Sequence, residues 1–283
     1  MPFITVGTEN NTAIDIYYED HGSGQPVVLI HGFPFNGATM EKLANPLLAA
    51  GYRVITYDRR GFGASSQPDT GYDYDTFAAD LDTLMTELDL RDTILAGHSM
   101  GTGEVTRYLS RYGSDRVSRG VLLSPLAPFL RKTSDNPEGV DGSVFDGFKQ
   151  AIAADRFAYL TAFCTSFFNY DQTKGKQVSE EAFQAHWAIG RLASARATYL
   201  CIDAISTDFR ADVPRIDVPI LIVQGDQDAV LPYPVTGQRL APMLPNGKLV
   251  TLKGAPHGIP WTHADEVNKA IMDFIGAPAM ARA

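Results

Sequence analysis

The sequence has little cysteine, and this scarcity excludes two kinds of stabilised domain. Among 283 residues there are only two cysteines, Cys164 and Cys201, which stand far apart and outside any CxxC or Cys/His ligand spacing. We therefore expect no disulfide framework and no zinc site, and we expect both thiols to be ordinary buried side chains. No set of metal ligands converges elsewhere in the sequence, so neither a metal nor another cofactor is expected.

Long apolar runs and an excess of basic residues are also missing. No apolar stretch reaches the roughly 18 residues that a membrane-spanning helix needs, and residues 1–10 lack the basic and then apolar pattern of a leader. Lys and Arg number 24 against 33 Asp and Glu, whereas nucleic acids and anionic membranes select for basic patches. We therefore expect a cytoplasmic protein that binds neither nucleic acid nor membrane but a small, neutral or apolar molecule.

What the sequence does contain is a series of short apolar runs bounded by glycine or proline. Six of them are rich in β-branched residues and do not alternate with polar residues, which is typical of strands buried on both faces of a parallel sheet. They occupy residues 26–32, 52–58, 92–98, 119–125, 218–225 and 247–254. Two further strands are expected at 3–8 and 14–19, joined by turn-forming residues at 9–12.

Helical sequence separates these runs. An apolar stripe at helical spacing runs from Phe77 to Leu88, and Asp75 is placed to cap that helix. Further helices are expected near residues 38–50, 100–112, 233–243 and 262–275. The repeated alternation of strand and helix predicts an α/β fold, with a parallel sheet covered by helices on both faces.

Residues 126–212 interrupt the alternation. They contain no convincing buried strand but many aromatic side chains on helical sequence, among them Phe163 and Trp187. We interpret this segment as a helical cap inserted into a core formed by residues 1–125 and 213–283. Some of its aromatic side chains are expected to line a pocket over the carboxyl ends of the strands, and the others to pack inside the cap.

The pentapeptide Gly97-His98-Ser99-Met100-Gly101 matches the pattern G-x-S-x-G. It follows a predicted strand and opens a predicted helix, which is the context of a nucleophile elbow. At such a turn the serine is held in a strained conformation and its flanking glycines avoid clashes with the neighbouring strand and helix. We therefore expect Ser99 to be a nucleophile, and the alternative is a simple Gly-Ser-Gly turn that caps a helix.

A base and an acid follow at later strand ends. His257 comes after the strand at 247–254, and Asp226 and Asp228 come after the strand at 218–225. A serine hydroxyl becomes nucleophilic when a histidine takes its proton and a carboxylate stabilises the resulting imidazolium. Either aspartate could supply that carboxylate, and the other would hold the turn by hydrogen bonds to the backbone.

An oxyanion hole needs two backbone donors near the nucleophile. We expect these to be the N–H groups of Met100, directly after Ser99, and of Phe33, after the third strand. The Phe33 side chain is also placed to form a wall of the pocket. Two other histidines lie close to these segments. We expect His31 to make a structural hydrogen bond beside the oxyanion loop, and we expect the side chain of His98 to point away from Ser99 Oγ.

With these residues identified, the sequence resembles the α/β-hydrolase superfamily along essentially its whole length. More narrowly, it resembles the cofactor-free (non-haem) haloperoxidase, perhydrolase and aryl esterase branch. The segments that carry this resemblance are HGFP (31–34), YDRRGFGASS (57–66), GHSMGTGEVTRY (97–108), DNPEG (135–139), TDFRADVPRIDVP (207–219), and GAPHG with WTHADEVN (254–268). Agreement over so many separated blocks is far more specific than the pentapeptide alone.

The resemblance implies a fold and a set of roles. The family fold is an eight-stranded, mostly parallel sheet with a helical cap. Ser99 then corresponds to the nucleophile, His257 to the base and Asp228 to the third member of the triad. Asp228 is favoured over Asp226 because the family's acid precedes a step like that at residues 229–232.

The resemblance also implies an activity. Family members hydrolyse small esters, and many let hydrogen peroxide replace water, so that a peracid forms and oxidises bromide or chloride without metal or haem. Pro34 accompanies good perhydrolase activity in the family by shifting a backbone carbonyl toward the peroxide, although it could instead only stiffen the turn. We expect the substrate, an ester or a carboxylic acid, to contact Phe33, Pro34, Met100, Phe163 and Trp187. Family members are often trimers or multiples of trimers, so a homo-oligomer is expected.

Two other functions stay open at the level of sequence. An amidase or γ-lactamase would use the same three residues, because both chemistries pass through one acyl-enzyme. A non-catalytic ligand-binding protein could keep the same fold. Related enzymes that use an aspartate nucleophile are disfavoured, because Ser99 occupies the elbow.

Overall fold

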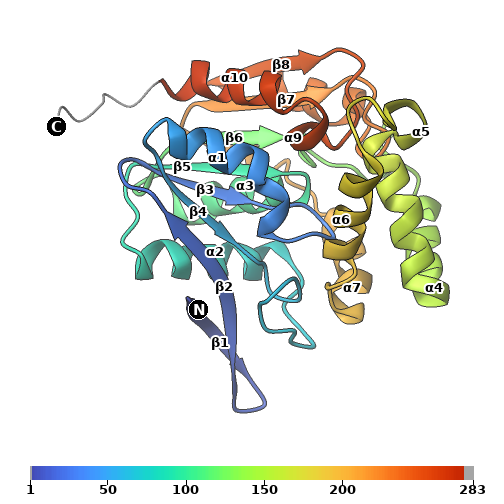
Figure 1. Cartoon of the computed structure of the whole chain (residues 1–283), viewed down its shortest axis with the longest axis horizontal. Coiled ribbons are helices and arrows are strands. Elements are labelled where there is room, and N and C mark those ends of the chain that lie inside the picture. The colour runs from blue at the N-terminus through green and yellow to red at the C-terminus, as the bar shows by residue number, and fades with distance from the viewer. Residues whose placement is uncertain (1, 277–283) are drawn as a thin grey trace.

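A computed structural model of the chain describes residues 2–276 and contains one eight-stranded sheet (Figure 1). The spatial order of its strands is β1-β2-β4-β3-β5-β6-β7-β8. The strands are β1 (Phe3–Glu9), β2 (Thr12–His21), β3 (Pro26–Ile30), β4 (Arg53–Tyr57), β5 (Thr93–His98), β6 (Val117–Leu123), β7 (Ile220–Gly225) and β8 (Gly247–Leu252). All eight strands fall where the sequence predicts them.

The antiparallel part of the sheet is confined to its N-terminal edge. Strand β2 pairs antiparallel with both β1 and β4, and every other neighbouring pair is parallel. The β1–β2 turn places Asn10 at φ 51° and Asn11 at φ 63°, a left-handed conformation that asparagine tolerates better than most residues. The expected eight-stranded, mostly parallel sheet is therefore confirmed.

Burial on both faces explains the continuous apolar runs. In β3, Val28 and Ile30 pack into one hydrophobic core, whereas Val27 and Leu29 pack into the core on the opposite face. Successive side chains of a strand point to opposite faces, so a strand covered on both sides needs apolar residues at every position.

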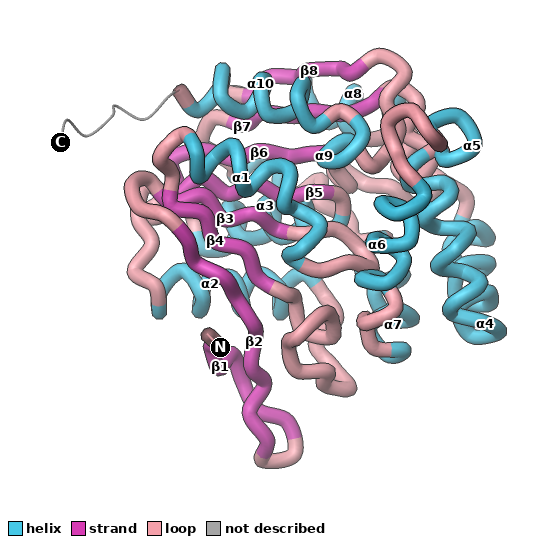
Figure 2. Tube along the Cα trace, viewed as in Figure 1, coloured by secondary structure: helices cyan, strands magenta, loops and turns pink. Residues whose placement is uncertain are grey.

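The helices that follow the strands cover the two faces (Figures 1 and 2). One face carries α1 (Glu41–Ala49) and α10 (Ala264–Ile275), and the other carries α2 (Tyr74–Glu87) and α3 (Met100–Tyr112). The short elements are η1 (Gly37–Met40), η2 (Val213–Arg215), η3 (Tyr233–Val235), α8 (Gly237–Leu240), η4 (Ala241–Met243) and α9 (Ile259–Thr262). This arrangement confirms the helices expected on both faces.

Two local expectations are wrong. The helix expected at 233–243 is divided into η3, α8 and η4, because Pro234 and Pro242 cannot donate a helical hydrogen bond. The cap of α2 is Asp73, whose Oδ1 accepts from Thr76 N at 2.9 Å, and not Asp75. Asp75 lies in the first turn, where its carboxylate pairs with arginines of α3.

Four helices gather at the carboxyl ends of the parallel strands (Figure 1). They are α4 (Gly142–Phe168), α5 (Tyr170–Thr173), α6 (Glu180–Gly190) and α7 (Ala195–Ile205), and we call them the helical block. All four lie within residues 126–212, the segment predicted to form an inserted cap. Helix α4 is broken at Asp155, which has φ −158° and whose carboxylate accepts from Phe157 N and Ala158 N.

The helical block has a small core of its own that reaches the sheet. Phe167, Phe168 and Phe183 pack there with Phe35, which follows β3. Within residues 2–276, no helix combines the length and the apolar character needed to cross a membrane. Residues 277–283, the end of the predicted core segment, lie outside the described part of the chain.

Candidate active site

Ser99 occupies a sharp turn between β5 and α3. Its backbone has φ 53° and ψ −119°, a conformation that costs strain for a non-glycine residue. A Cβ atom on Gly97 would collide with the Gly101 carbonyl oxygen, and a Cβ atom on Gly101 would collide with that of Ile30. The flanking glycines are therefore required by close backbone packing, as expected for a nucleophile elbow.

Ser99, His257 and Asp228 form one chain of hydrogen bonds. Ser99 Oγ lies 2.8 Å from His257 Nε2, and His257 Nδ1 lies 2.8 Å from Asp228 Oδ2. The exposed fraction is 5% for Ser99, 0% for His257 and 6% for Asp228. The structure thus brings together three residues that follow three different strands.

The Asp228 carboxylate accepts several further hydrogen bonds. Its Oδ1 accepts from the backbone N–H groups of Val230 at 3.0 Å and Leu231 at 2.8 Å. Its Oδ2 also accepts from Gln224 Nε2 at 3.2 Å. Both carboxylate oxygens thus act as hydrogen-bond acceptors. Because Asp228 Oδ2 accepts, His257 donates to it through Nδ1–H, and His257 Nε2 accepts from the hydroxyl of Ser99.

Gln224 is a residue of this site that the sequence does not reveal. It lies on β7, where its Oε1 accepts from Gly237 N at 2.9 Å and its Nε2 donates to Leu231 O at 2.8 Å. These bonds hold the loop that carries Asp228. The only signal of Gln224 in the sequence is a polar residue inside an otherwise apolar strand. The structure shows that this residue is fully buried.

Asp226, the alternative acid, lies apart from the imidazole. Its Oδ1 accepts from Gly254 N at 2.6 Å, which ties the end of β7 to the turn after β8. This contact is the turn-holding role that the sequence offered as the alternative for one of the two aspartates.

The backbone of His257 is held by neighbours on two strand ends. His98 Nε2 donates to the His257 carbonyl oxygen at 3.1 Å, and Ser124 Oγ donates to the same oxygen at 3.2 Å. Burial, with a smaller contribution from His257, lowers the pKa of His98 to about 3. His98 is therefore neutral and acts on the loop of His257, not on Ser99.

The two expected oxyanion donors lie on segments that touch each other. A Cβ atom on Gly32 would lie 2.9 Å from the Ser99 Cβ, so the loop that carries Phe33 packs directly against the elbow. Among residues 2–276, neither the Phe33 N–H nor the Met100 N–H makes a hydrogen bond. Both N–H groups could therefore donate to a bound molecule.

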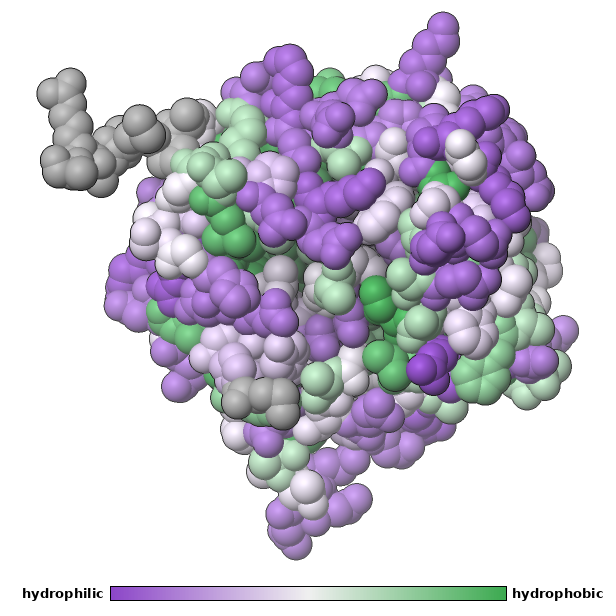
Figure 3. Space-filling model, viewed as in Figure 1, coloured by the Kyte–Doolittle hydropathy of each residue, from purple (hydrophilic) through white to green (hydrophobic). Residues whose placement is uncertain are grey.

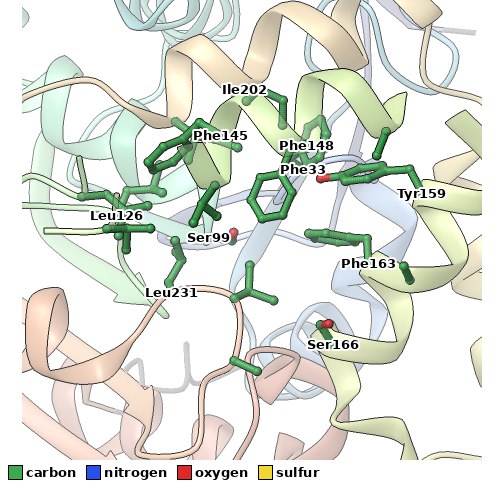
Figure 4. A pocket seen from close by; sticks show the side chains of 18 of the residues that line it. Phe33, Ser99, Leu126, Phe145, Phe148, Tyr159, Phe163, Ser166, Ile202 and Leu231 are labelled. Carbon is green, nitrogen blue, oxygen red and sulfur yellow. The ribbon is translucent and has the colours of Figure 1, made fainter. Parts of the chain in front are cut away.

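A cavity of about 640 Å³ opens beside Ser99 (Figure 4). In Figure 4, Leu126 and Leu231 lie on one side of Ser99, and the ring of Phe33 lies on the other side. The other lining side chains are almost all apolar, and they come mainly from α4 and α7. They include Leu130, Val140, Val144, Phe145, Phe148, Ala151, Ala154, Asp155, Ala158, Tyr159, Ala162, Phe163, Ser166, Ile202, Ile205, Ala229, Val230 and Pro232.

The face of the molecule seen in Figure 3 has a different character from this cavity. In the view of Figure 3 it is mostly hydrophilic, and apolar side chains show only in small groups. The apolar lining beside Ser99 thus differs from the face seen in Figure 3, and such a lining is typical of a site for a small molecule.

Only two of the five residues expected to contact substrate line the cavity. Phe33 and Phe163 line the cavity, whereas Pro34, Met100 and Trp187 are not among its lining residues. The Trp187 indole donates to Thr161 Oγ1 at 3.0 Å and its ring lies beside Phe157. Of the two aromatic residues of the segment 126–212 that were expected to contact substrate, Phe163 lines the cavity and Trp187 does not.

Metal ligands do not cluster in the described part of the chain. Within residues 2–276, no three His, Cys, Asp or Glu side chains are arranged so that they could hold a metal ion.

The fold, the strained serine and its hydrogen-bonded histidine and aspartate together define a protein of the α/β-hydrolase class.

Comparisons with known proteins agree with this class. Residues 25–264 match the family model described as alpha/beta hydrolase fold. A protein of Synechocystis sp. that is provisionally named as a non-heme chloroperoxidase is 60% identical, over 97% of this chain and 100% of the relative. The bifunctional esterase/perhydrolase of Acinetobacter calcoaceticus is 36% identical, over 93% of this chain and 96% of the relative.

A solved structure of a bromoperoxidase has the same fold. The bromoperoxidase from Bacillus anthracis superimposes with a TM-score of 0.93 at 45% identity, covering 97% of this chain and 99% of that one. This chain belongs to the non-heme haloperoxidase and perhydrolase branch of the α/β-hydrolase family. The resemblance found in the sequence is thereby confirmed.

Proposed function

We propose that this protein is a serine esterase with perhydrolase activity, in which Ser99 is the nucleophile, His257 the base and Asp228 the orienting acid. The observation that carries the proposal is the hydrogen-bonded chain of these three residues at an apolar cavity. The names of the relatives support the same activity.

The first half-reaction forms an acyl-enzyme. Ser99 Oγ attacks the ester carbonyl carbon while its proton passes to His257 Nε2, and the carbonyl oxygen becomes an oxyanion. When the oxyanion collapses, the ester C–O bond breaks and the leaving alkoxide takes the proton from His257. Asp228 stabilises the imidazolium between these two transfers.

The second half-reaction regenerates the serine. Water gives a proton to His257 Nε2 and attacks the acyl carbon, which forms a second oxyanion. When this oxyanion collapses, the bond between the acyl carbon and Ser99 Oγ breaks, Ser99 Oγ takes the proton from His257, and a carboxylic acid is released. Hydrogen peroxide can take the place of water, and the product is then a peracid. A peracid reacts with bromide to give the carboxylate and hypobromous acid, a two-electron oxidation of the halide that needs no group on the protein.

The N–H groups of Phe33 and Met100 are proposed to stabilise the oxyanion. Removal of one such donor from a serine hydrolase costs about 2.7–4 kcal/mol in the transition state. Neither N–H is used within the described part of the chain, so both can be directed at a developing charge without breaking another bond.

The cavity favours an uncharged ester with an apolar acyl group. Its volume of about 640 Å³ exceeds what an acetyl group fills, and its lining is dominated by aromatic and aliphatic side chains. Asp155 is the one acidic residue among the lining residues, and it would repel a substrate carboxylate.

Location and assembly are further parts of the proposal. Cys164 and Cys201 are both free and buried, which agrees with a reducing compartment such as the cytoplasm. A homo-oligomer, a trimer or a multiple of it, is proposed from the family resemblance alone. Light scattering coupled to size-exclusion chromatography measures its mass directly.

The proposal is tested by two assays on the wild type and Ser99→Ala. The assays are p-nitrophenyl acetate hydrolysis and bromide-dependent bromination of monochlorodimedone in acetate and hydrogen peroxide. We expect the wild type to be active in both and the variant in neither. Esterase activity that survives Ser99→Ala would refute the role of Ser99, and a wild type silent in both assays would refute the proposed reaction.

A further inference from the structure

Two backbone segments meet at the candidate oxyanion hole without a side chain between them. One is the loop His31–Phe33 after β3, and the other is the elbow Ser99–Gly101. A Cβ atom on Gly101 would lie 2.9 Å from the His31 carbonyl oxygen and closer still to that of Ile30. The separation of the two proposed donors therefore depends on how the loop is held against the first turn of α3.

A buried ion pair connects these two segments. Arg59, in the loop after β4, is 1% exposed, and Glu104, on α3, is 0% exposed. Arg59 donates to Glu104 Oε1 through both Nε and Nη2. Arg59 Nη2 also donates to the His31 carbonyl oxygen at 2.9 Å. One guanidinium thus binds the oxyanion loop and the nucleophile helix at the same time.

The ring of His31 strengthens the link on the loop side. Its Nε2 accepts from the backbone N–H of Arg59 at 3.0 Å, and its Nδ1 donates to the Gly32 carbonyl oxygen at 2.9 Å. These bonds need the neutral imidazole, and burial together with Arg59 lowers the pKa of His31 well below its usual value. The loop is therefore fixed to Arg59 through both the side chain and the carbonyl of His31.

Two tyrosines complete the link on the helix side. Tyr57 OH donates to Glu104 Oε2, which fixes the second carboxylate oxygen. Tyr74 OH donates to the Met100 carbonyl oxygen at 3.0 Å. Glu104 lies about one helical turn after Met100 on α3, so the ion pair is attached to the helix close to the proposed donor.

We propose that the Arg59–Glu104 pair is a positioning device that sets the geometry between the Phe33 and Met100 donors. Neither residue of the pair lines the cavity, so both act through the backbone of other residues and not on the substrate. This inference rests on the proposed function, because it assigns a purpose to the oxyanion hole of that reaction.

A pair that only stabilises the fold and a pair that positions the oxyanion donors predict different effects of its replacement on catalysis. Burying two charges has a desolvation cost, and an apolar pair of similar volume is often as stable or more stable. If the pair serves only stability, its replacement by Met and Leu leaves catalysis intact. If it sets the oxyanion geometry, the same folded variant loses turnover.

The neighbouring residue supplies a matched control. Arg60 forms a bidentate pair with Asp80 of α2, at 2.6 Å for each bond, and both side chains are nearly as buried as those of the first pair. The hydrogen bonds of this second pair reach neither His31 nor α3. The experiment therefore compares the double variants R59M/E104L and R60M/D80L with the wild type.

Four quantities are measured on each protein: the melting temperature, kcat and KM for a p-nitrophenyl ester, and the affinity for an aryl trifluoromethyl ketone. The ketone forms a tetrahedral adduct with the serine, and its oxyanion uses the same two donors. For R59M/E104L we expect kcat and ketone affinity to fall together by about tenfold to a hundredfold, with KM within about twofold of the wild type. For R60M/D80L we expect both quantities to stay close to the wild type.

Wild-type kcat and ketone affinity in folded R59M/E104L would overturn the inference, as would an equal loss in R60M/D80L. If R59M/E104L does not fold, Arg59→Lys provides the test. A single ammonium lacks the planar fork that reaches Glu104 and His31 together, so kcat should again fall while KM holds. Unchanged kcat in Arg59→Lys would then overturn the inference.

Labelling by a fluorophosphonate separates this inference from the proposed function. A wild type that is labelled at Ser99 while R59M/E104L keeps full kcat contradicts only the positioning role. A wild type that is not labelled at Ser99 contradicts the proposed function itself, and with it the positioning role.

Discussion

The ring of Phe167 lies edge-on against the imidazole of His257, with the ring centroids 5.4 Å apart and the planes at 79°. The backbone of Phe167 is engaged as well, because its carbonyl oxygen accepts from Gly258 N at 2.8 Å. Phe167 belongs to α4, so the helical block contacts the proposed base directly and does more than cover the cavity.

This contact predicts that Phe167→Leu lowers kcat by about tenfold, because a small displacement of a general base is costly. The loss in the free energy of unfolding should be about 1–1.5 kcal/mol, as for other swaps of similar volume. Ester hydrolysis and thermal unfolding measure the two effects. Phe183→Leu is the control, since Phe183 packs in the same cluster but against Tyr170. An equal loss of kcat in both variants would contradict a specific contact with His257.

The two aspartates after β7 should differ sharply in their effect on turnover. Asp228→Asn removes the charge that orients and stabilises the imidazolium, so we expect kcat to fall by about 10⁴. Asp226→Asn weakens only the bond to Gly254 N, and its kcat should stay within about twofold of the wild type. Steady-state hydrolysis of a p-nitrophenyl ester distinguishes them, and a larger loss in Asp226→Asn would reverse the assignment of the acid.

The cavity predicts a dependence on acyl chain length. Each methylene buried by the substrate contributes about 0.8 kcal/mol, so kcat/KM should rise from acetate to octanoate esters. Ala158→Trp places a large ring in the cavity and should lower kcat/KM for the octanoate by about tenfold or more, with little change for the acetate. Ala153→Trp, on the same helix but outside the lining, is the control. Equal losses for both esters would show that the acyl chain does not occupy this cavity.

Buried histidines predict a loss of stability in mild acid. Burial lowers the pKa of His98 to about 3 and that of His186 to about 4, below their ordinary value of 6.5. Between these values the unfolded chain binds more protons than the folded one, so the free energy of unfolding decreases as the pH falls from about 6.5 toward 4. Each histidine contributes up to about 1.4 kcal/mol per pH unit.

Urea unfolding across this pH range measures the slope. His186→Leu removes one of these buried groups and should reduce the slope by up to about 1.4 kcal/mol per pH unit, which corresponds to one proton. His21→Gln removes an exposed imidazole and is the matched control. A slope that His186→Leu leaves unchanged would contradict a neutral, buried His186.

The sheet could be predicted because each strand is a local pattern. A strand covered on both faces, such as β3, must be apolar at every position, and that run is visible without knowing its neighbours. Ser99 and His257 could be proposed for a similar reason, since each comes soon after a strand and parallel strands end at one edge. Asp228 could be distinguished from Asp226 only by the family resemblance. Errors arose where competing residues were close together, as with Asp73 and Asp75 at the start of α2.

What could not be predicted depends on contacts between distant segments. Arg59 and Glu104 are 45 residues apart in the sequence, and nothing in either segment shows that they meet. The same holds for the cavity: Phe145 and Phe163 line it and Trp187 does not, although all three are aromatic residues on helices of one block. Which helix face is turned to the cavity is decided by tertiary packing.

Trapping the acyl-enzyme tests the role of Ser99 most directly. The wild type is mixed with a p-nitrophenyl ester, quenched in acid within the first turnovers, digested and examined by mass spectrometry. We expect an acyl group on Ser99, and loss of both ester hydrolysis and peroxide-dependent bromination in Ser99→Ala. An acyl group on another residue, or bromination that persists in Ser99→Ala, would contradict this role.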